Sequence, residues 1–151
     1  MFPITRILCP TDFSNASYQA VEVANEMAKL FNSELFLLHV VSPVPVPSAP
    51  VPTMYNVPLY RKELADSAEH SLQVMVEEIV DENLTVHQVI IKGEPARDVV
   101  KFASENNIDL IVISSHSEEK IHDFLFGSVA DKIIRTSSSP VLTIKPEIEI
   151  E

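Results

Sequence analysis

Gly93 and Gly127 are the only two glycines in this chain of 151 residues. Average usage of about 7% would supply roughly ten. Glycine adopts a positive φ without strain and lets other groups approach the backbone closely, so we expect these two to sit where a side chain does not fit. Gly127 and Ser128 also open a predicted helix, whose free N–H groups and dipole attract anions. The pattern therefore predicts an anion site at the start of that helix.

Other residues with chemical potential form weaker patterns. Two histidines and three acidic residues lie between positions 116 and 123, but they lack a histidine pair at i and i+4, so we expect no metal. Cys9 lies in an apolar run, where burial suppresses the thiolate. His39 lies in another apolar run and is expected to be a hydrogen-bonded core residue. No G-x-S-x-G elbow occurs among the many serines, so we expect no enzyme.

Short apolar runs alternate with helical patterns along the whole chain. The expected strands are residues 4–9, 34–41, 85–92, 109–114 and 140–144; the expected helices follow a cap at Asp12 or Ser14, run from Leu59 to Asp81, start near Pro95, and span Gly127–Arg135. On the first helix, Phe31 is placed on the apolar face. Such alternation predicts an α/β fold: a doubly wound, five-stranded parallel sheet of order 3-2-1-4-5 with helices on both faces. One domain of residues 1–146 would contain a proline-rich loop at 42–58, and 147–151 would form an acidic tail.

In a sheet of this order, ligands bind beyond the carboxyl ends of strands 1 and 4, where the strand order reverses. The candidate site therefore combines Pro10, Thr11 and Asp12 after the first strand with residues 114–119 after the fourth. The start of the last helix, at Gly127 and Ser128, lies at the same end. This placement follows from the strand order before any motif is considered.

Motifs at these positions carry a family resemblance. The segments I-L-C-P-T-D-F-S near the N-terminus, L-L-H-V-V at 37–41, G-E-P-A at 93–96 and D-L-I-V-I-S-S-H at 109–116 resemble the universal stress protein family, as do G-S-V-A-D-K-I-I-R-T at 127–136 and P-V-L-T-I at 140–144. The match runs almost the whole length in the right order. The resemblance implies the same doubly wound fold and a homodimer formed through the last strand.

Many members of that family bind ATP through G-x-x-G, nine residues, and G-[ST], whereas another branch lacks the signature and does not bind ATP. The resemblance places it on Ser114, Ser117, Gly127 and Ser128, with serine at two of the three glycine positions. A serine adds a Cβ and restricts a phosphate-binding turn, although its hydroxyl can donate. Two glutamates at 118 and 119 follow where the family usually has a basic residue, and carboxylates oppose phosphate. We expect weak or absent ATP binding.

The adenosine half of the family's site is better kept. Asp12 matches the acidic residue after the first strand and would accept from a ribose hydroxyl, while the backbone of Val40 would meet the adenine edge. The full candidate pocket is Pro10, Thr11, Asp12, Val40, Ser114, Ser117, Gly127, Ser128 and Val129. Two alternatives stay open: Asp12 as a helix cap, and Gly127 as a packing residue. No resident cofactor is expected, and an adenine nucleotide is the ligand class left open.

Charge and composition bound the partners. A net charge of −11 argues against nucleic acid and anionic membranes. No apolar run reaches the roughly 18–20 residues of a membrane span, and one cysteine fits a reducing cytoplasm. The leading hypothesis is a dimeric, non-enzymatic stress-response module that acts on an unidentified protein partner, with Val141 and Thr143 on its pairing edge. The alternative is an adenine-nucleotide sensor with slow hydrolysis.

Overall fold

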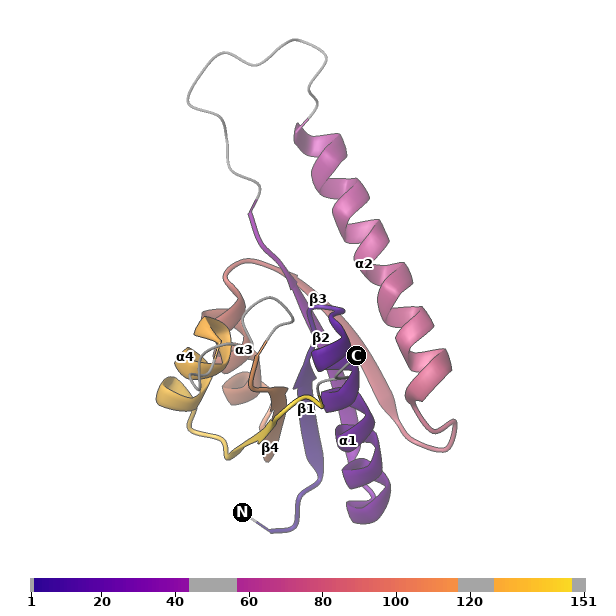
Figure 1. The fold of residues 1–151 in the computed structure, drawn as a ribbon, viewed down its shortest axis with the longest axis vertical. Helices are drawn as coiled ribbons and strands as arrows, with labels where there is room; N and C mark the ends of the chain where they lie inside the picture. The colour runs from indigo at the N-terminus through magenta and orange to yellow at the C-terminus, as the bar shows by residue number, and fades with distance from the viewer. Residues whose placement is uncertain (1, 44–56, 117–126, 148–151) are drawn as a thin grey trace.

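The computed structural model describes residues 2–43, 57–116 and 127–147, which form five strands and four helices. In chain order the elements are β1 (Arg6–Pro10), α1 (Asn15–Phe31), β2 (Glu34–Val41), α2 (Val57–Ile79), β3 (Val86–Lys92), α3 (Pro95–Glu105), β4 (Leu110–Ser114), α4 (Ser128–Thr136) and β5 (Val141–Ile144). Figure 1 shows α1 and α2 together on one side of the sheet, and α3 and α4 together on the other.

The sheet is parallel throughout and has the order β3-β2-β1-β4-β5, so the predicted doubly wound fold is confirmed. Side chains alternate between its two faces, as the pleat of a strand requires. Leu35 and Leu37 of β2 pack with α1 and α2, whereas Phe36 and Leu38 pack with α3 and α4. Both faces of the sheet are therefore buried, and this accounts for the unbroken apolar run of β2.

The caps of α1 show why the helix begins and ends where it does. Ser14 is the N-cap, and its side chain accepts a hydrogen bond from the N–H of Ser17. Asn32 ends the helix in the left-handed conformation, with its N–H directed to the carbonyls of Ala28 and Lys29. Of the two caps that the sequence allowed, the structure uses Ser14, because Asp12 lies too far upstream to reach the N3 amide.

Two details differ from the sequence prediction. α2 begins at Val57, so Pro58 belongs to its first turn, where proline costs no helical hydrogen bond. The proline-rich range is thus shorter than expected, and residues 44–56 lie outside the described part of the chain. Phe31 was expected on the buried face of α1, but its side chain is exposed because it is the last helical residue before the turn at Asn32. Val21 and Ala28 are buried instead.

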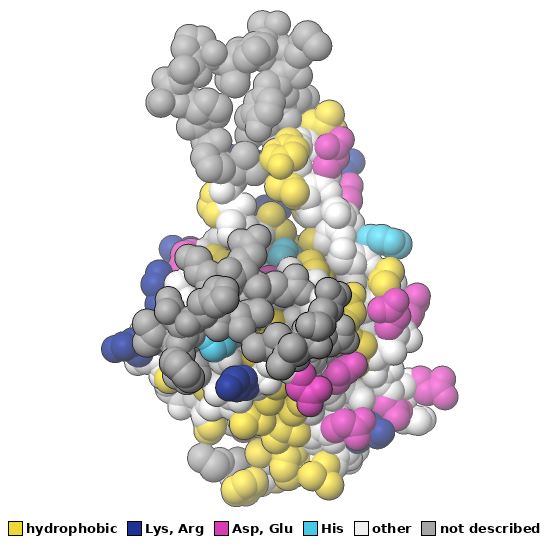
Figure 2. All heavy atoms as spheres, in the orientation of Figure 1, with side chains coloured by type: hydrophobic (Ala, Val, Ile, Leu, Met, Phe, Trp, Pro, Cys, Tyr) yellow, Lys and Arg dark blue, Asp and Glu magenta, His cyan; other side chains and the backbone are white. Residues whose placement is uncertain are grey.

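Acidic and basic side chains are unevenly distributed (Figure 2). Exposed acidic residues gather over α2 and the turn after it, and exposed basic residues gather over α3 and α4. The acidic group includes Glu69, Glu77, Glu78 and Glu82; the basic group includes Arg97, Lys101, Lys132 and Arg135. Among the described residues, no helix is long and apolar enough to cross a membrane.

Asp109 ties the start of β4 to the start of β1. Its Oδ2 accepts hydrogen bonds from the N–H of Thr5 at 2.8 Å, the hydroxyl of Thr5 at 2.9 Å and the N–H of Arg6 at 3.0 Å. Burial raises the pKa of Asp109, but the hydrogen bonds from Thr5 and Arg6 outweigh it, and the pKa lies below its ordinary value. These bonds hold the two central strands in register from their amino ends.

We expect Asp109→Asn to destabilise the protein near neutral pH and much less in acid. A carboxyl group whose pKa is lowered in the folded state stabilises it above the unfolded pKa of about 3.9 and loses that contribution as the pH falls through the folded pKa. Urea unfolding at about pH 7 and about pH 3 measures the gap between variant and wild type. Asp66→Asn, at an exposed position on α2, is the control. A gap of equal size at both pH values would contradict the account.

Candidate functional site

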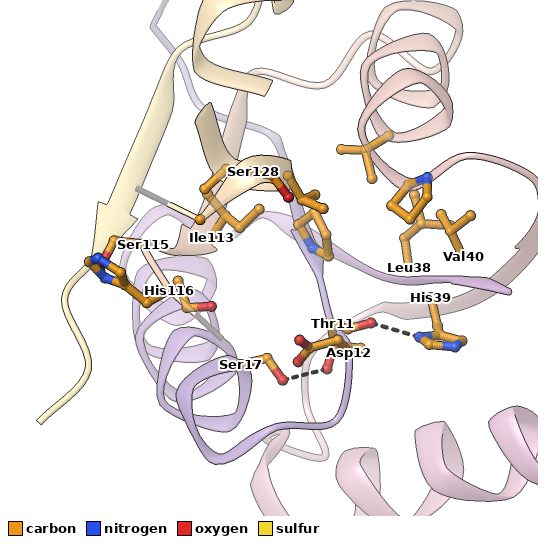
Figure 3. A pocket seen from close by; sticks show the side chains of 17 residues that line it. Thr11, Asp12, Ser17, Leu38, His39, Val40, Ile113, Ser115, His116 and Ser128 are labelled. Atoms are coloured by element: carbon orange, nitrogen blue, oxygen red, sulfur yellow. Dashed lines mark hydrogen bonds between the residues drawn. The ribbon is translucent and has the colours of Figure 1, made fainter. Parts of the chain in front are cut away.

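A cavity of about 180 Å³ opens at the carboxyl ends of β1 and β4, where the strand order reverses (Figure 3). Its described lining comes from β1, β2, β4, the turn before α1, and the first turns of α3 and α4. The lining residues are Pro10, Thr11, Asp12, Ser17, Leu38, His39, Val40, Pro95, Val99, Ile113, Ser114, Ser115, His116, Gly127, Ser128, Val129 and Ala130. It is smaller than the ~300–1,000 Å³ of many drug-sized sites, so it suits part of a nucleotide better than all of one.

The turn after β1 forms one wall of the cavity. The N–H of Thr11 donates to the carbonyl of Leu38 at 2.9 Å, which extends the β1–β2 pairing by one residue. The Thr11 hydroxyl oxygen accepts from the N–H of Phe13 at 3.0 Å and lies 2.9 Å from the hydroxyl of Ser17. Because the Ser17 hydroxyl donates to the carbonyl of Ser14, Thr11 must donate in its bond to Ser17. Thr11 is therefore satisfied as both donor and acceptor while buried.

Phe13 adopts the left-handed conformation, with φ of 65°. This conformation is strained for a bulky residue and persists only where the surroundings hold it. Two contacts do so: the bond from its N–H to Thr11, and packing of its ring on His39, with ring centroids 4.5 Å apart. The strain is thus located in the turn that presents Asp12.

Asp12 turns its carboxylate into the cavity (Figure 3). The N–H of Ser14 donates to its Oδ1 at 3.0 Å, and the hydroxyl of Ser14 also donates to that oxygen. Asp12 therefore positions the N-cap residue but is not itself the N-cap of α1, which settles one of the two alternatives raised by the sequence. A carboxylate accepts about four hydrogen bonds. Two from Ser14 leave acceptor capacity for a ligand.

The backbone of Val40 faces the same space. Along β2, Glu34 and Leu38 bond to the β1 side and Leu35 and Val41 bond to the β3 side. By this alternation, the N–H and C=O of Val40 point toward β1. The β1 pairing ends at Pro10 opposite Leu38, followed by the bond from Thr11. Val40 thus presents one donor and one acceptor beyond the end of β1.

The start of α4 forms the opposite wall. The N–H of Gly127 donates to the carbonyl of Ser115 at 2.8 Å, and the carbonyl of Gly127 accepts from Asp131 at 2.9 Å. Its φ of −57° is open to any residue, so backbone conformation does not require glycine at this position. The helix starts here because Ser128 begins an amphipathic run, and its exposed first turn is open to an anion.

Gly93 behaves as the sequence predicted, for a reason of space. A Cβ at this position would lie 1.9 Å from Oδ2 of Asp98. That oxygen accepts from the N–H of Glu94 at 2.7 Å, while the Glu94 side chain accepts from the N–H of Arg97 at 2.8 Å. The hydrogen bond and charge of Arg97 lower the pKa of Asp98. These reciprocal bonds cap α3, whose first residues line the cavity.

The structure brings eight of the nine predicted pocket residues to this cavity. They are Pro10, Thr11, Asp12, Val40, Ser114, Gly127, Ser128 and Val129. The ninth, Ser117, lies outside the described residues, together with the glutamates at 118 and 119 and the rest of the loose cluster up to 123. The role of these nine as ligand contacts stays a prediction.

The rest of the lining was predicted only in part. Ser115 and His116 belong to the predicted segment 114–119, and the hydroxyl oxygen of Ser115 lies 2.7 Å from Nδ1 of His116. His116 Nε2 is buried and has no hydrogen-bond partner in the described part of the chain. His39 was predicted to be a core residue, but it is only half-buried and lines the cavity; its Nδ1 donates to the carbonyl of Thr11 at 2.8 Å. The expected hydrogen bond of His39 is present. The expected full burial of His39 is wrong, because β2 extends beyond the end of β1.

The electrostatics of the described lining are simple. Asp12 supplies the only carboxylate of the described lining, and that lining contains no lysine or arginine. Among those residues no group of three or more His, Cys, Asp and Glu side chains could hold a metal ion. Cys9 is completely buried, which raises the pKa of its thiol far above the ordinary range and makes it a poor nucleophile.

Comparison with known proteins agrees with this architecture. The model of the universal stress protein family matches residues 3–145. The chain belongs to the universal stress protein family. The universal stress protein MJ0531 of Methanocaldococcus jannaschii is 29% identical over 140 residues, covering 93% of this chain and 81% of that protein.

Two solved structures extend the comparison. The structure of MJ0577 is similar with a TM-score of 0.75 and 26% identity, covering 97% of this chain and 99% of that one. MJ0577 is itself a universal stress protein of Methanocaldococcus jannaschii. A universal stress protein solved in complex with cAMP has a TM-score of 0.66 and 20% identity, covering 94% of this chain and 97% of that one. At that identity the likeness shows a shared fold.

We predict that Thr11→Val lowers the free energy of unfolding by about 1–3 kcal/mol, because it leaves the partly buried N–H of Phe13 and the buried Ser17 hydroxyl oxygen without their partner. Thr136→Val is the matched control: the Thr136 hydroxyl bonds within α4 at an exposed position, and its loss is expected to cost at most about 0.5 kcal/mol. Urea denaturation of both variants decides the point. Equal losses would show that Thr11 does not organise the turn.

Proposed function

We propose that this chain is a non-catalytic regulatory module. It binds adenosine or adenosine monophosphate in the cavity that lies where the strand order reverses, and it binds ATP weakly. The observation that carries the proposal is the makeup of the described lining, which is apolar with a few hydrogen-bonding groups, one carboxylate and no lysine or arginine. A nucleoside is held by apolar walls and a few placed polar groups, whereas phosphate groups are best held by cations and backbone N–H groups.

The base would lie against β2. Val40 offers an N–H to ring nitrogen N1 of adenine and a C=O to its 6-amino group. Guanine carries the opposite pattern, a donor at N1 and an acceptor at position 6, so the same two backbone groups would reject it. Leu38, Val99 and Ile113 supply apolar surface to the cavity that receives the ring.

The ribose would lie against the turn after β1. The carboxylate of Asp12 is held by Ser14 and faces the cavity, where it can accept from a ribose hydroxyl. The same charge disfavours anions nearby, since like charges repel most where water is partly excluded. Asp12 therefore favours a nucleoside and opposes a chain of phosphates.

The start of α4 would receive at most a short phosphate. The N–H of Gly127 is already bonded to Ser115, which leaves the next N–H groups of the first turn and the hydroxyl of Ser128 to meet an anion. In the sequence, Glu118 and Glu119 stand where relatives usually carry a basic residue. The free N–H groups of the first turn and the Ser128 hydroxyl can hold one phosphate. They do not offset the negative charge of three phosphates.

A nucleotide complex among the structural neighbours supports an adenine ligand through the shared fold. That protein was solved with cAMP, a cyclic adenosine monophosphate. Its fold is the fold of this chain, so an adenine ligand is compatible with the architecture. The particular residues of this cavity carry the rest of the argument.

Isothermal titration calorimetry of the wild-type protein tests the proposal. We expect adenosine and AMP to bind at least about tenfold more tightly than ATP and GMP, a difference of about 1.4 kcal/mol. Asp12→Ala is expected to weaken adenosine binding by about tenfold, because it removes a hydrogen-bond acceptor. It is also expected to reduce the difference in affinity between AMP and ATP, because it removes a negative charge. Asp66→Ala, on the exposed side of α2, should change neither.

A low-micromolar dissociation constant for ATP would overturn the proposal, as would equal binding of AMP and GMP. Steady release of phosphate from ATP by the purified protein would contradict the non-catalytic assignment. Tight ATP binding together with phosphate release would favour an adenine-nucleotide sensor that hydrolyses ATP slowly.

We also propose that the module acts as a homodimer paired through β5. β5 is the last strand of the sheet, and the backbone bonds of Pro140 and Ile144 run to β4. By alternation, the N–H and C=O of Val141 and Thr143 point away from β4, toward the outer edge. An edge of this kind pairs with its own copy across a two-fold axis.

Thr143→Pro is expected to convert the dimer to a monomer while preserving the fold, because it removes an outward N–H and leaves the β4 ladder intact. Thr143→Ala keeps that N–H and should stay dimeric. Analytical ultracentrifugation at high micromolar concentration, with circular dichroism to confirm folding, makes the measurement. A monomeric wild-type protein, or a dimeric Thr143→Pro variant, would contradict the pairing.

A further inference from the structure

We infer that Pro10 is a positioning residue. Because proline has no backbone N–H, Pro10 keeps the sheet open at the place where the strand order reverses, beside the cavity. The inference rests on the proposed function, because it explains why the cavity can receive a ligand. It concerns a backbone group of this chain, so part of it can be tested without any ligand.

The pairing of β1 differs on its two sides. With β2 the register runs over five pairs, from Arg6 opposite Glu34 to Pro10 opposite Leu38. With β4 it holds only two pairs, Ile7 opposite Leu110 and Leu8 opposite Ile111. The β2 ladder starts at Arg6 and the β4 ladder at Ile7, next to the bonds of Asp109 to Thr5 and Arg6. Of the three pairs that the β4 ladder lacks, one lies at the amino end, at Arg6, and two lie at the carboxyl end, at Cys9 and Pro10, beside the cavity.

The alternation of β1 identifies the missing bond. The carbonyl of Arg6 accepts from the N–H of Asp109, so Arg6, Leu8 and Pro10 direct their backbone groups toward β4. With Leu8 opposite Ile111, the next bond of the ladder would run from the N–H of residue 10 to the carbonyl of Val112. Proline has no N–H, so this bond cannot form.

The loss on the β4 side does not disturb β2. The backbone groups that β1 sends to β2 belong to odd-numbered residues, and the N–H of Thr11 completes that ladder at 2.9 Å from Leu38. Proline at position 10 thus ends one ladder while permitting the other. Proline at 9 or 11 would instead break the pairing with β2 and loosen the wall that carries Val40.

The consequence is a crevice with defined walls. β1 pairs with β2 as far as Pro10, β4 pairs with β5 as far as Ser114 opposite Ile144, and the pairing of β1 with β4 ends at Leu8 opposite Ile111. Pro10 and Ser114 line the cavity, with Ile113 between the walls. An alanine at position 10 would supply the absent donor and favour closure of this space by the carbonyl of Val112.

Pro10→Ala tests the inference by two readouts. We expect the new amide at position 10 to be protected from hydrogen exchange at the level of other β1 amides, and adenosine affinity to fall by about tenfold. A variant with lactic acid at position 10, whose ester linkage also lacks an N–H, should retain adenosine binding. Pro58→Ala, which removes a proline from the first turn of α2 outside the cavity lining, should not reproduce the loss.

The inference would be overturned by an unprotected amide at position 10 of the Pro10→Ala variant, or by unchanged adenosine binding of that variant. An equal loss of adenosine affinity in the ester variant would also overturn it, because it would assign the effect to the proline ring. Failure of the wild-type protein to bind adenosine would defeat the proposed function. In that case hydrogen exchange at position 10 of Pro10→Ala still decides whether the missing N–H ends the ladder, so the two failures are distinguishable.

Discussion

The unequal pairing of β1 with its two neighbours is the constraint on which the site depends. Hydrogen bonds to β2 continue through Thr11, whereas the assigned pairing with β4 ends at Leu8. Everything placed at the cavity follows from that difference. The turn after β1 is held against β2, and the backbone of Val40 lies beyond the end of β1. β4 continues its pairing with β5 as far as Ser114.

The turn after β1 shows how the fold supports this opening. Thr11 uses its buried hydroxyl twice, and Phe13 adopts a left-handed conformation that glycine would adopt with less strain. Packing on His39 and capping of α1 by Ser14 offset that strain. The net effect is a carboxylate, Asp12, whose position is determined by a rigid turn rather than by a mobile side chain. Rigid presentation lowers the entropy cost of binding a small ligand.

Much of the architecture could be predicted from local patterns. The apolar run of β2 matched its observed bounds of Glu34–Val41, and the alternation of strands with helices led to the correct strand order. The sequence offered Asp12 or Ser14 as the cap of α1, and Ser14 is the cap in the structure, because capping depends on neighbouring residues. The strand order in turn located the cavity, since a reversal in order opens a parallel sheet at a known place.

The remaining features depend on contacts between distant residues. Asp109 bonds to residues about a hundred positions away, and no local pattern shows this. Gly127 stood out because glycine is rare in this chain, yet its φ of −57° is one that any residue adopts. His39 looked like a core residue because its neighbours in β2 are apolar, and only the early end of β1 exposes it. Of these three residues, Gly127 and His39 line the cavity, whereas Asp109 lies at the amino ends of the strands.

The most direct test of the account is the amide resonance of Val40 in a ¹H–¹⁵N spectrum recorded during titration with adenosine. We predict that Val40 shifts strongly with adenosine and AMP, together with residues of the turn after β1, and that it shifts little with GMP. Shifts that spare Val40, or a Val40 shift produced by ATP alone, would contradict the central claim that the base of an adenine ligand is read by the backbone beyond the end of β1.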